Sequence, residues 1–434
     1  MSAVPAGELR MRALIDAAER AQTQGNSGEA SQLLALAQSE TPDNPAVLGA
    51  FGVHALRNGN ALEAKKFFEG AIAKNGANPG VYLNLASALR EIGDAVGEMD
   101  ALDSALKLDP YYYLALFQKG SLLEKLGHVK LAAGAFHAAL SSLAPGTQVP
   151  PTLVPVIEHA QICVRAHFQE LDGFLREQMR DVRKQHAGFA QDRVDDCLAN
   201  LIGVKRIYVQ QPTFTHFPRL PAIEFFDREN FAWLAAVEAA TEDMRMELAQ
   251  ILETSLEDFS PYVTYPPQTP LNQWKELNHS RRWSSLFLFK EGQRLEENVA
   301  RCPKTIAALE RAPLVVIPRR APTAFFSRLE AHTRIPPHTG VSNTRLTVHI
   351  PLIVPPDCGF RVGSSVREWR PGHALIFDDT IEHEAWNNSS EPRVILIFDI
   401  WNPLLTPTER ELMVSATTAI AEFYGDSAPA YTNY

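Results

Sequence analysis

Hydrophobic and small residues recur with a period of 34 along the first third of the chain. Four registers keep this period, one of glycines, two of small residues and one of large apolar residues: Gly25, Gly59, Gly93, Gly127; Ala18, Gly52, Ala86, Gly120; Ala37, Ala71, Ala105, Ala139; and Leu34, Phe68, Leu102, Phe136. Such a period is typical of stacked helical hairpins, because small residues let two helices approach, large apolar residues fill the space between them and glycine permits a tight turn. We therefore predict a helical solenoid over residues 1–146, in which Pro42 and Pro110 each end a second helix.

The period and the residue types together resemble the tetratricopeptide repeat. Glu98 departs from the pattern, because the equivalent positions 30, 64 and 132 hold alanine, and none of the repeats carries the tryptophan usual in that family. The resemblance implies a concave surface that binds a protein or peptide. Three alternatives stay open: the array packs on the rest of the chain, it forms a dimer, or the segment is a generic helical bundle.

Helical patterning returns after a break rich in proline and glycine, "SSLAPGTQVPPTLVP". The stretch "HFQELDGFLREQMRDVRKQHAGF" is charged and amphipathic, which predicts a solvated helix. Further along, "RIYVQQPTFTHFPRLPAIEFFDREN" is enriched in proline and aromatic residues. We therefore predict a helical connector over 147–210 and a further domain over 211–434.

From about residue 310 the hydrophobic period changes from helical to two. Short runs rich in Val, Ile, Phe and Trp, such as "TRLTVHIPLIVP" and "RVILIFDIWNP", alternate with Pro, Gly, Asn and Asp. No helical pattern separates these runs, which favours an antiparallel barrel or sandwich over a parallel sheet. The final "LTPTERELMVSATTAIAEFY" predicts a closing helix. The predicted fold class is therefore α+β and multidomain.

Composition and charge exclude several classes of function. The 434 residues include 41 Lys and Arg against 51 Asp and Glu, a net charge of −10, which argues against a general binder of nucleic acid or of anionic membranes. The N-terminal stretch lacks the apolar core of a signal peptide, and no run is apolar enough to span a membrane. Four scattered cysteines without a CxxC pair suggest free thiols. We expect a cytoplasmic protein.

Polar side chains follow one face of a predicted strand in the C-terminal half. Within "RLTVH", Arg345, Thr347 and His349 alternate with Leu346 and Val348, so the three polar groups share a face. Their burial would be costly unless a polar ligand meets them.

Two histidines and a further arginine complete the candidate site. His338 and His383 each lie at the edge of a predicted strand, and Arg393 opens an apolar strand ten residues after His383. A pair of histidines alone is more often structural. The order of these groups, however, suits a non-haem Fe(II) centre with a dicarboxylate co-substrate, because imidazoles ligate iron and a guanidinium grips a carboxylate.

Residues 325–410 resemble the aspartyl/asparaginyl β-hydroxylase family of 2-oxoglutarate-dependent dioxygenases. The resemblance rests on "PPHTGVSNTRLTVHIPL" and "LIFDDTIEHEAWNNSSEPRVILIFDIWNPLLTPTER", and more loosely on "FFSRLEA". It implies a double-stranded β-helix, or jelly roll. It also implies that Gly340, which stands where most such oxygenases have a carboxylate ligand, belongs to the family's own pattern.

The resemblance also implies roles for individual residues. His338 and His383 would ligate Fe(II), and Arg393 with Ser327 would bind the distal carboxylate of 2-oxoglutarate. His349 would lie near the other end of that co-substrate, and Arg345 would line the active site as a catalytic residue.

Two positions qualify these roles. Thr347 stands where family members have a second arginine, which puts an aspartyl-type substrate in doubt. Asp378 and Asp379 belong to the motif, and we interpret Asp379 as a turn residue rather than as a hydrogen-bond acceptor behind the iron.

The expected function is that of an Fe(II)- and 2-oxoglutarate-dependent hydroxylase of an unactivated C–H bond, supported by ascorbate. The expected substrate is an Asp- or Asn-type side chain in a protein or peptide that the repeats recruit. The alternatives are hydroxylation of a small molecule or lipid-linked group, halogenation, and a non-catalytic repeat scaffold with a degenerate barrel.

Overall fold

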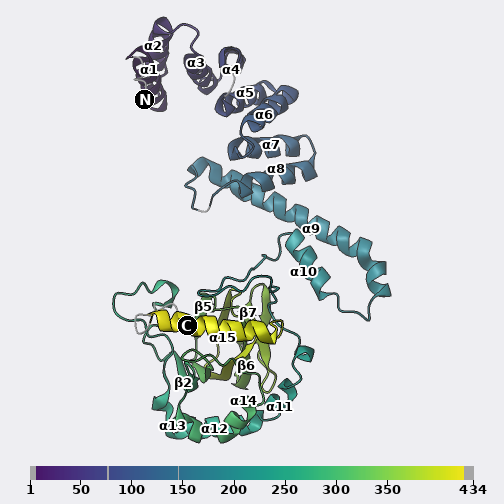
Figure 1. Ribbon diagram of the computed structural model, residues 1–434. Coiled ribbons are helices and arrows are strands. Elements are labelled where there is room, and N and C mark those ends of the chain that lie inside the picture. Colours follow the sequence, from purple (N-terminus) through teal and green to yellow (C-terminus); the bar gives the residue numbers. More distant parts are fainter. Residues whose placement is uncertain (1–5, 76–77, 145, 425–434) are drawn as a thin grey trace. The chain divides into compact units, whose positions relative to one another are not determined.

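The computed structural model of the chain describes residues 6–75, 78–144 and 146–424 (Figure 1). The chain divides into two compact units, Met1–Gly203 and Val204–Tyr434. The first unit is α-helical, and the second is built on two antiparallel sheets with flanking helices. This confirms the predicted α+β, multidomain fold class. Within the described ranges, every helix is too short or too polar to cross a bilayer.

Eight helices form the four predicted hairpins of the first unit. They are α1 (Ala6–Thr23), α2 (Ser27–Glu40), α3 (Pro45–Arg57), α4 (Ala61–Asn75), α5 (Pro79–Ile92), α6 (Ala95–Leu108), α7 (Tyr113–Lys125) and α8 (Val129–Ser141). Each hairpin turn contains one glycine of the 34-residue register, and these glycines have φ angles of 80–85°. That left-handed conformation is strained for other residues, which explains why glycine recurs there.

The small-residue registers lie where two helices of a hairpin touch. A Cβ added at Gly52 would come 2.5 Å from the ring of Phe68, and one added at Gly120 would come equally close to Phe136. The exceptional Glu98 is buried and accepts a hydrogen bond of 2.9 Å from the Gln118 side chain. The departure from alanine is thus accommodated by a polar partner on the next hairpin.

Two further helices complete the first unit, as the pattern over 147–210 predicts. A single turn of 3₁₀ helix, η1 (Pro151–Leu153), leads into the 32-residue α9 (Val154–Gln185), which packs on α8, and α10 (Asp192–Leu201) follows. The second unit begins at Val204, whereas we predicted residue 211. The physical reason is that Tyr208 and Gln210 already contact the second unit: Arg361 donates to the Tyr208 hydroxyl across 3.4 Å, and the Gln210 amide donates to Asp378.

Within its described residues, the second unit has eleven strands, which form two antiparallel sheets. They are β1 (Ser260–Pro261), β2 (Trp283–Lys290), β3 (Gln293–Arg294), β4 (Ala324–Leu329), β5 (Thr333–His338), β6 (Arg345–Ile353), β7 (Cys358–Val362), β8 (Ser365–Arg367), β9 (Leu375–Phe377), β10 (His383–Asn387) and β11 (Arg393–Trp401). The large sheet has the order β1-β2-β4-β11-β6-β9, with β3 beside β2, and the small sheet has the order β5-β10-β7-β8. From β4 onward the chain crosses repeatedly between the sheets, and only the β7–β8 hairpin stays within the small sheet. A double-stranded β-helix would have such crossings, although the paired strands here do not close into a barrel.

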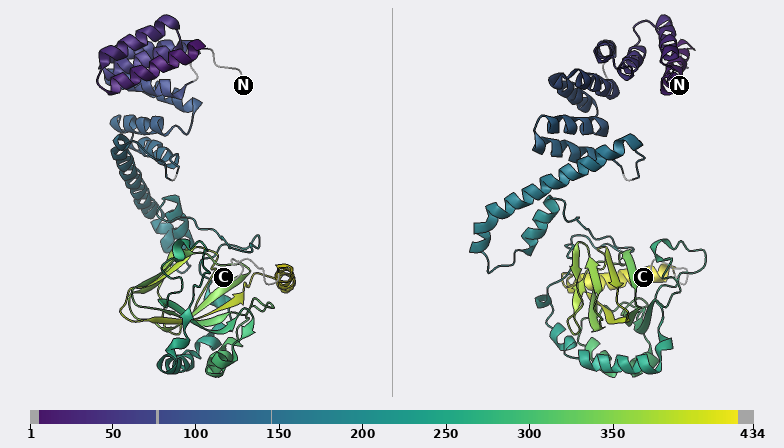
Figure 2. Two further views of the ribbon diagram at one scale, coloured as in Figure 1. Left: turned by 90° about the vertical axis from the view of Figure 1, so that its left-hand side faces the viewer. Right: turned by 180° about the vertical axis from the view of Figure 1, so that it is seen from behind.

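Short helices cover the outer face of the large sheet (Figures 1 and 2). They are α11 (Leu234–Glu238), α12 (Thr241–Thr254), α13 (Glu296–Ala300) and α14 (Pro303–Leu309), with the 3₁₀ turns η2 (Arg228–Asn230), η3 (Leu256–Asp258) and η4 (Asn272–Trp274) nearby in sequence. The closing helix α15 (Pro407–Tyr424) was predicted from the sequence. The strands β1–β3 were not, because the strand pattern was recognised only from about residue 310.

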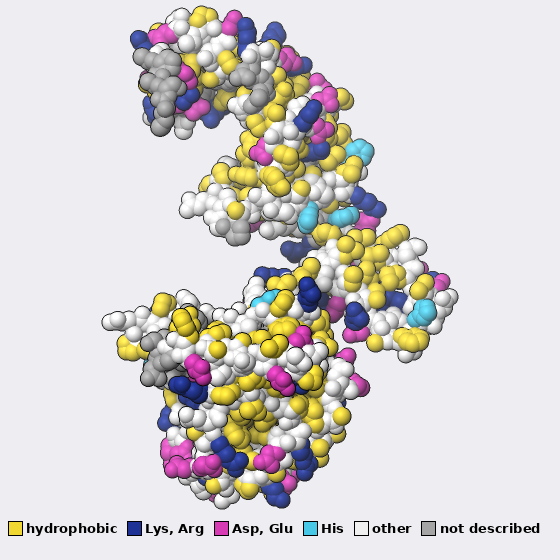
Figure 3. All heavy atoms as spheres, in the orientation of Figure 1, with side chains coloured by type: hydrophobic (Ala, Val, Ile, Leu, Met, Phe, Trp, Pro, Cys, Tyr) yellow, Lys and Arg dark blue, Asp and Glu magenta, His cyan; other side chains and the backbone are white. Residues whose placement is uncertain are grey.

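The two faces of the large sheet have different roles. Leu346 and Val348 of β6 pack into the core beneath the helices, with Met244 and Leu248 of α12. The alternating residues Arg345, Thr347 and His349 line a cavity on the opposite face, as predicted from the strand period. On the face of the molecule shown in Figure 3, acidic and basic side chains are interspersed.

Candidate functional site

All six predicted site residues line one cavity of about 910 Å³ in the second unit. They come from both sheets: Ser327, Arg345, His349 and Arg393 from the large sheet, and His338 and His383 from the small sheet. Residues separated by as many as 66 positions therefore meet in one place, which is the arrangement that the motif order predicts.

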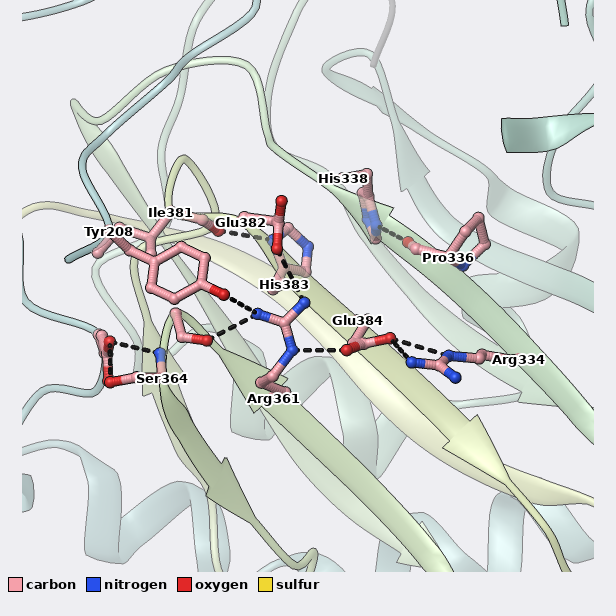
Figure 4. Close-up of polar contacts among 12 residues, drawn as sticks. Tyr208, Arg334, Pro336, His338, Arg361, Ser364, Ile381, Glu382, His383 and Glu384 are labelled. Atoms are coloured by element: carbon pink, nitrogen blue, oxygen red, sulfur yellow. Dashed lines mark hydrogen bonds and ion pairs between the residues drawn. The ribbon is translucent and has the colours of Figure 1, made fainter. Parts of the chain in front are cut away.

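The two candidate metal-binding histidines lie side by side on paired strands (Figure 4). His338 ends β5 and faces His383, the first residue of β10, and their ring centroids are 4.1 Å apart. The Nδ1 of His338 lies 2.8 Å from the Pro336 carbonyl oxygen, and the Nδ1 of His383 lies 3.1 Å from that of Ile381. Because a carbonyl only accepts, each Nδ1 carries the proton, and each Nε2 keeps a lone pair for a metal.

Burial keeps both rings neutral. Desolvation lowers the pKa of His338 to about 4, and desolvation together with the neighbouring His338 lowers the pKa of His383 well below its usual value. Neutral imidazole is the form that ligates a metal ion. The pair is therefore ready to bind a cation at neutral pH without first losing protons.

A carboxylate lies beside Gly340, on another element. A Cβ built on Gly340 would overlap the side chain of Asp379, and the Gly340 N–H donates to the Asp379 carbonyl. Burial raises the pKa of Asp379 to about 7, and its Oδ1 lacks a hydrogen-bond partner among the described residues. The loop before β10 thus brings a carboxylate into the space that a side chain at position 340 would fill, so Asp379 is more than a turn residue.

Arg393 is the largest fully buried side chain of the described chain. Its Nε and Nη1 have no hydrogen-bond partner within the described residues, and its guanidinium lies 4.7 Å above the Trp369 ring. Burial lowers the pKa of Arg393 to about 10, which leaves the group charged at neutral pH. A buried cation with unpaired donors is costly unless an anion binds it, so the cavity is suited to a carboxylate here.

Two buried serines line the same cavity as Arg393 and extend this anion site. Ser327 is fully buried on β4, and its Oγ accepts a hydrogen bond of 3.1 Å from the Trp283 indole. Ser285 lies directly across from Ser327 on β2, and its buried Oγ has no partner among the described residues. Ser285 is not among the residues predicted from the sequence, because β2 was not recognised as a strand.

His349 has the opposite tautomer from the paired histidines. The Trp369 indole N–H donates to its Nδ1 across 3.4 Å, so in the neutral ring the proton lies on Nε2. Burial and the nearby Arg393 lower the pKa of His349 well below its usual value. His349 is therefore placed as a hydrogen-bond donor rather than as a metal ligand.

Arg345 and Thr347 share one buried carboxylate. The Nη1 of Arg345 lies 2.8 Å from Asp399 Oδ2, and the Thr347 hydroxyl donates to Asp399 Oδ1 across 3.3 Å. Asp399 lies opposite Thr347 on β11. The Arg345 guanidinium is thus committed to an internal ion pair within the cavity wall.

An ion-pair network holds the strand that carries His383 (Figure 4). Arg361 of β7 contacts Glu384 at 2.5 Å and Glu382 at 2.9 Å, and Arg334 of β5 pairs with Glu384 from the other side. Both glutamates flank His383 in sequence. These residues were not predicted from the sequence, although "EHE" contains the two acidic positions.

The first residues of the second unit also support the site. The Gln210 amide donates to Asp378 Oδ2 across 2.5 Å, and the Thr213 N–H donates to the Gly340 carbonyl across 2.9 Å. Thr213 lines the cavity as well. The sequence held no signal for this, because the contacts span more than 120 residues.

Aromatic rings form one wall of the cavity, starting from His338. Trp274 lies 5.0 Å from the His338 ring, Trp283 stacks on Tyr262 at 4.2 Å, and Tyr262 stacks on Phe325 at 5.2 Å. All of these residues line the cavity. The space in front of the histidine pair is therefore bounded by apolar surface.

Comparison with known proteins agrees with this geometry. Residues 238–403 match the family described as aspartyl/asparaginyl β-hydroxylase. An ornithine lipid ester-linked acyl 2-hydroxylase of Rhizobium tropici is 35% identical over 187 residues, 42% of this chain and 62% of that protein. An aspartyl/asparaginyl β-hydroxylase of Homo sapiens is 37% identical over 137 residues, 31% of this chain and 18% of that protein. The chain thus spans less than two thirds of either relative.

Among solved structures, the MamA protein is similar to the helical part. It aligns with 18% sequence identity and a TM-score of 0.31, covering 42% of this chain and 97% of MamA. The repeat architecture itself follows from the 34-residue register and the helix bounds.

Proposed function

We propose that this chain is an Fe(II)- and 2-oxoglutarate-dependent hydroxylase of the aspartyl/asparaginyl β-hydroxylase family, whose model matches residues 238–403. One observation carries the proposal: two neutral imidazoles and a buried guanidinium with unpaired donors line the same cavity. The first two suit a ferrous ion, and the third suits the distal carboxylate of a dicarboxylate.

The two neutral imidazoles, with a carboxyl group lining the same cavity, suit a ferrous ion. His338 and His383 would hold the metal through Nε2, and a cation there would favour the ionised form of Asp379, whose pKa burial raises to about 7. When bound, the metal with 2-oxoglutarate supplies the oxidative chemistry that inserts an oxygen atom of O₂ into a C–H bond.

The remaining residues bind and orient. Arg393 would receive the distal carboxylate of 2-oxoglutarate in a bidentate pair, and the Ser327 and Ser285 hydroxyls would donate to it. His349 would donate from Nε2 toward the same molecule. The carbonyls of Pro336 and Ile381 fix both metal-binding rings, and the aromatic wall excludes water.

The cavity supports an apolar substrate segment better than a carboxylate side chain. Arg345 is paired with Asp399, and Thr347, at a position where the family resemblance implies an arginine, is hydrogen-bonded to the same carboxylate. Tyr262 and Phe325 offer apolar contact instead. We therefore propose an acyl or similar hydrocarbon chain as the acceptor of the hydroxyl group, which agrees with the name of the Rhizobium tropici relative. The name of the human relative favours an Asp- or Asn-type side chain as the second candidate.

We further propose that the repeats recruit the partner that carries the substrate. The hairpins expose large apolar side chains, among them Leu62, Val96 and Leu131. Stacked helical repeats commonly use such exposed positions to bind a protein or peptide.

The proposal is tested by succinate formation. Purified protein with Fe(II), 2-oxoglutarate and ascorbate should release succinate slowly without substrate and faster with it. The His383→Ala variant should release none, because one of the two imidazole ligands is gone. The matched control is His332→Asn, which changes an exposed histidine on the turn before β5 and should keep full turnover.

Substrate class is tested with the same enzyme. Acyl-chain compounds and aspartyl or asparaginyl peptides are offered separately, and products are examined by mass spectrometry for the addition of one oxygen atom. If the protein neither binds 2-oxoglutarate nor releases succinate, the hydroxylase proposal is wrong and the chain is a non-catalytic scaffold. Oxygen addition to peptides alone would overturn the acyl substrate and keep the enzyme.

A further inference from the structure

A second group of metal-binding side chains lies in the helical unit. Glu124 of α7 meets His159 and Cys163 of α9, and one donor atom from each lies within 4.8 Å of the others. His159 and Cys163 are four residues apart, so they share one face of the helix. None of these residues takes part in the proposed hydroxylase site.

Cys163 is already spaced from His159 and from Glu124 like a ligand of a tetrahedral metal site, whereas His159 and Glu124 lie at hydrogen-bond distance and would have to move apart. His159 Nε2 lies 2.7 Å from Glu124 Oε2, Cys163 Sγ lies 3.3 Å from His159 Nε2, and Cys163 Sγ lies 3.5 Å from Glu124 Oε1. Zinc bond lengths of about 2.0–2.3 Å place tetrahedral ligands about 3.3–3.6 Å apart. Small side-chain rotations would therefore admit a metal ion at the centre.

The surroundings favour a cation there. Glu124 lies in the last turn of α7 (Tyr113–Lys125), where unpaired carbonyl groups give the helix end a partial negative charge. Phe136 contacts the His159 ring edge to face at 5.9 Å and so restricts its rotation. The side chains of His159 and Glu124 are 50% and 38% exposed, which leaves a route for the ion and a place for water as a fourth ligand.

We propose that Glu124, His159 and Cys163 bind Zn²⁺. The set combines a thiolate, an imidazole and a carboxylate, which are the ligand types that zinc takes in proteins. The carboxylate and the thiolate together neutralise the ion. Bound zinc would link α7, the first helix of the last repeat hairpin, to α9, and would fix the end of the repeat array.

Without a metal the same residues form a hydrogen-bonded cluster. The Cys163 thiol donates to Glu124, and burial and that carboxylate both raise the pKa of Cys163. A hydrogen-bonded cluster alone would explain a contact between two helices. Such a cluster alone would not bind a metal ion through the Cys163 sulfur, so metal binding distinguishes the two states.

Cobalt(II) is the probe, because a cobalt–thiolate bond gives a charge-transfer absorption that imidazole and carboxylate ligands do not. The full-length protein is stripped with a chelator and titrated with Co²⁺, both as wild type and as His338→Ala/His383→Ala, which lacks the iron ligands. We expect the thiolate band in both proteins, saturating at one equivalent in the double variant, and displacement of the cobalt by Zn²⁺.

Matched variants in the double-variant background identify the ligands. Cys163→Ser should abolish the band, whereas Cys197→Ser, at an exposed free thiol on α10, should leave it unchanged. His159→Gln and Glu124→Gln keep hydrogen-bonding capacity and should weaken the affinity by at least about tenfold. Far-ultraviolet circular dichroism checks that each variant is folded, and the two Gln variants decide the question if Cys163→Ser is not.

The outcome is decisive in either direction. Absence of the band in the double variant, or a band that survives Cys163→Ser, would overturn the zinc site. Neither result would affect succinate formation by the wild type, so this proposal and the hydroxylase proposal fail independently.

Discussion

The two units bury polar groups in opposite ways. In the described part of the repeat unit a single polar side chain, Glu98, is buried, and Gln118 satisfies it. The β-sheet unit buries twenty, among them Arg393 with unpaired Nε and Nη1 and Asp379 with an unpaired Oδ1. Buried polar groups without partners cost free energy, so they indicate a place shaped for a ligand rather than for stability.

The contrast indicates which parts of the chain stabilise the fold and which part carries the candidate site. Apolar contacts repeated at a fixed period stabilise the helical hairpins, and each hairpin depends on its neighbours. In the β-sheet unit, the outer core beneath the helices stabilises the sheets, while the inner face carries the polar site. Substitutions in the two regions should therefore separate loss of folding from loss of activity.

The largest expected effect is on the folding of the repeat unit. Phe136→Ala removes a fully buried ring that lies against Gly120, and it should lower the free energy of unfolding by about 3–5 kcal/mol. Chemical denaturation followed by circular dichroism measures this. Leu131→Ala, at a residue that is 63% exposed on the same helix, should change stability by less than about 0.5 kcal/mol. Succinate formation without added substrate, by the folded fraction, should be unchanged in both variants.

Next in size is the effect of a side chain at position 340. Gly340→Asp should lower succinate formation about 100-fold, because the new side chain must displace the Asp379 carboxylate from the site. The double variant Gly340→Asp/Asp379→Gly returns one carboxylate to the same space and should recover much of the activity. If the double variant is no better than the single one, the two positions do not share that space.

Arg393→Met should separate co-substrate binding from stability. The KM for 2-oxoglutarate should rise roughly 10–100-fold, because one or two charge-assisted hydrogen bonds to its distal carboxylate are lost. The thermal stability of the ligand-free protein should stay equal or increase, because the desolvation cost of an unpaired guanidinium disappears. Arg393→Lys keeps the charge but not the forked geometry, and its KM should be intermediate. Unfolding of the Met variant would show that Arg393 is structural.

The smallest effect concerns charge pairs outside the site. Burial alone would raise the pKa of Glu238, but hydrogen bonds from Arg228 and from the Ala374 N–H outweigh it and lower the pKa below the ordinary value. The ionised form therefore contributes stability above the pKa of an unfolded carboxyl, about 4.3, and this is lost as the pH falls through the lower folded pKa.

Glu238→Gln should consequently cost at most about 1 kcal/mol at pH 7, and this difference from wild type should shrink in acid. Thermal unfolding at a series of pH values measures it. Asp43→Asn, in an exposed ion pair of the repeat unit with Lys74, should have no measurable effect at any pH.

Much of the site could be predicted from the order of residue types. His338, His383 and Arg393 lie in segments of clear strand pattern, and a face of period two places Arg345, Thr347 and His349 together. The roles of Ser285, Asp399 and Arg361 could not be predicted, because each depends on a partner from a strand distant in sequence. The zinc-site residues likewise come from two helices 35 residues apart.

By itself, the sequence determined the features that depend on local period: the 34-residue hairpins, the turn glycines and the alternation of buried and polar positions along β6. It also determined which side-chain types, namely imidazole, guanidinium and carboxyl groups, are available to form the candidate site. Only the tertiary structure decided that the Asp379 carboxylate fills the space beside Gly340, that Arg393 has unpaired donors and that Asp399 holds Arg345. The reason is physical, since hydrogen bonding and desolvation depend on which groups meet in space, and that is set by strand pairing rather than by local pattern.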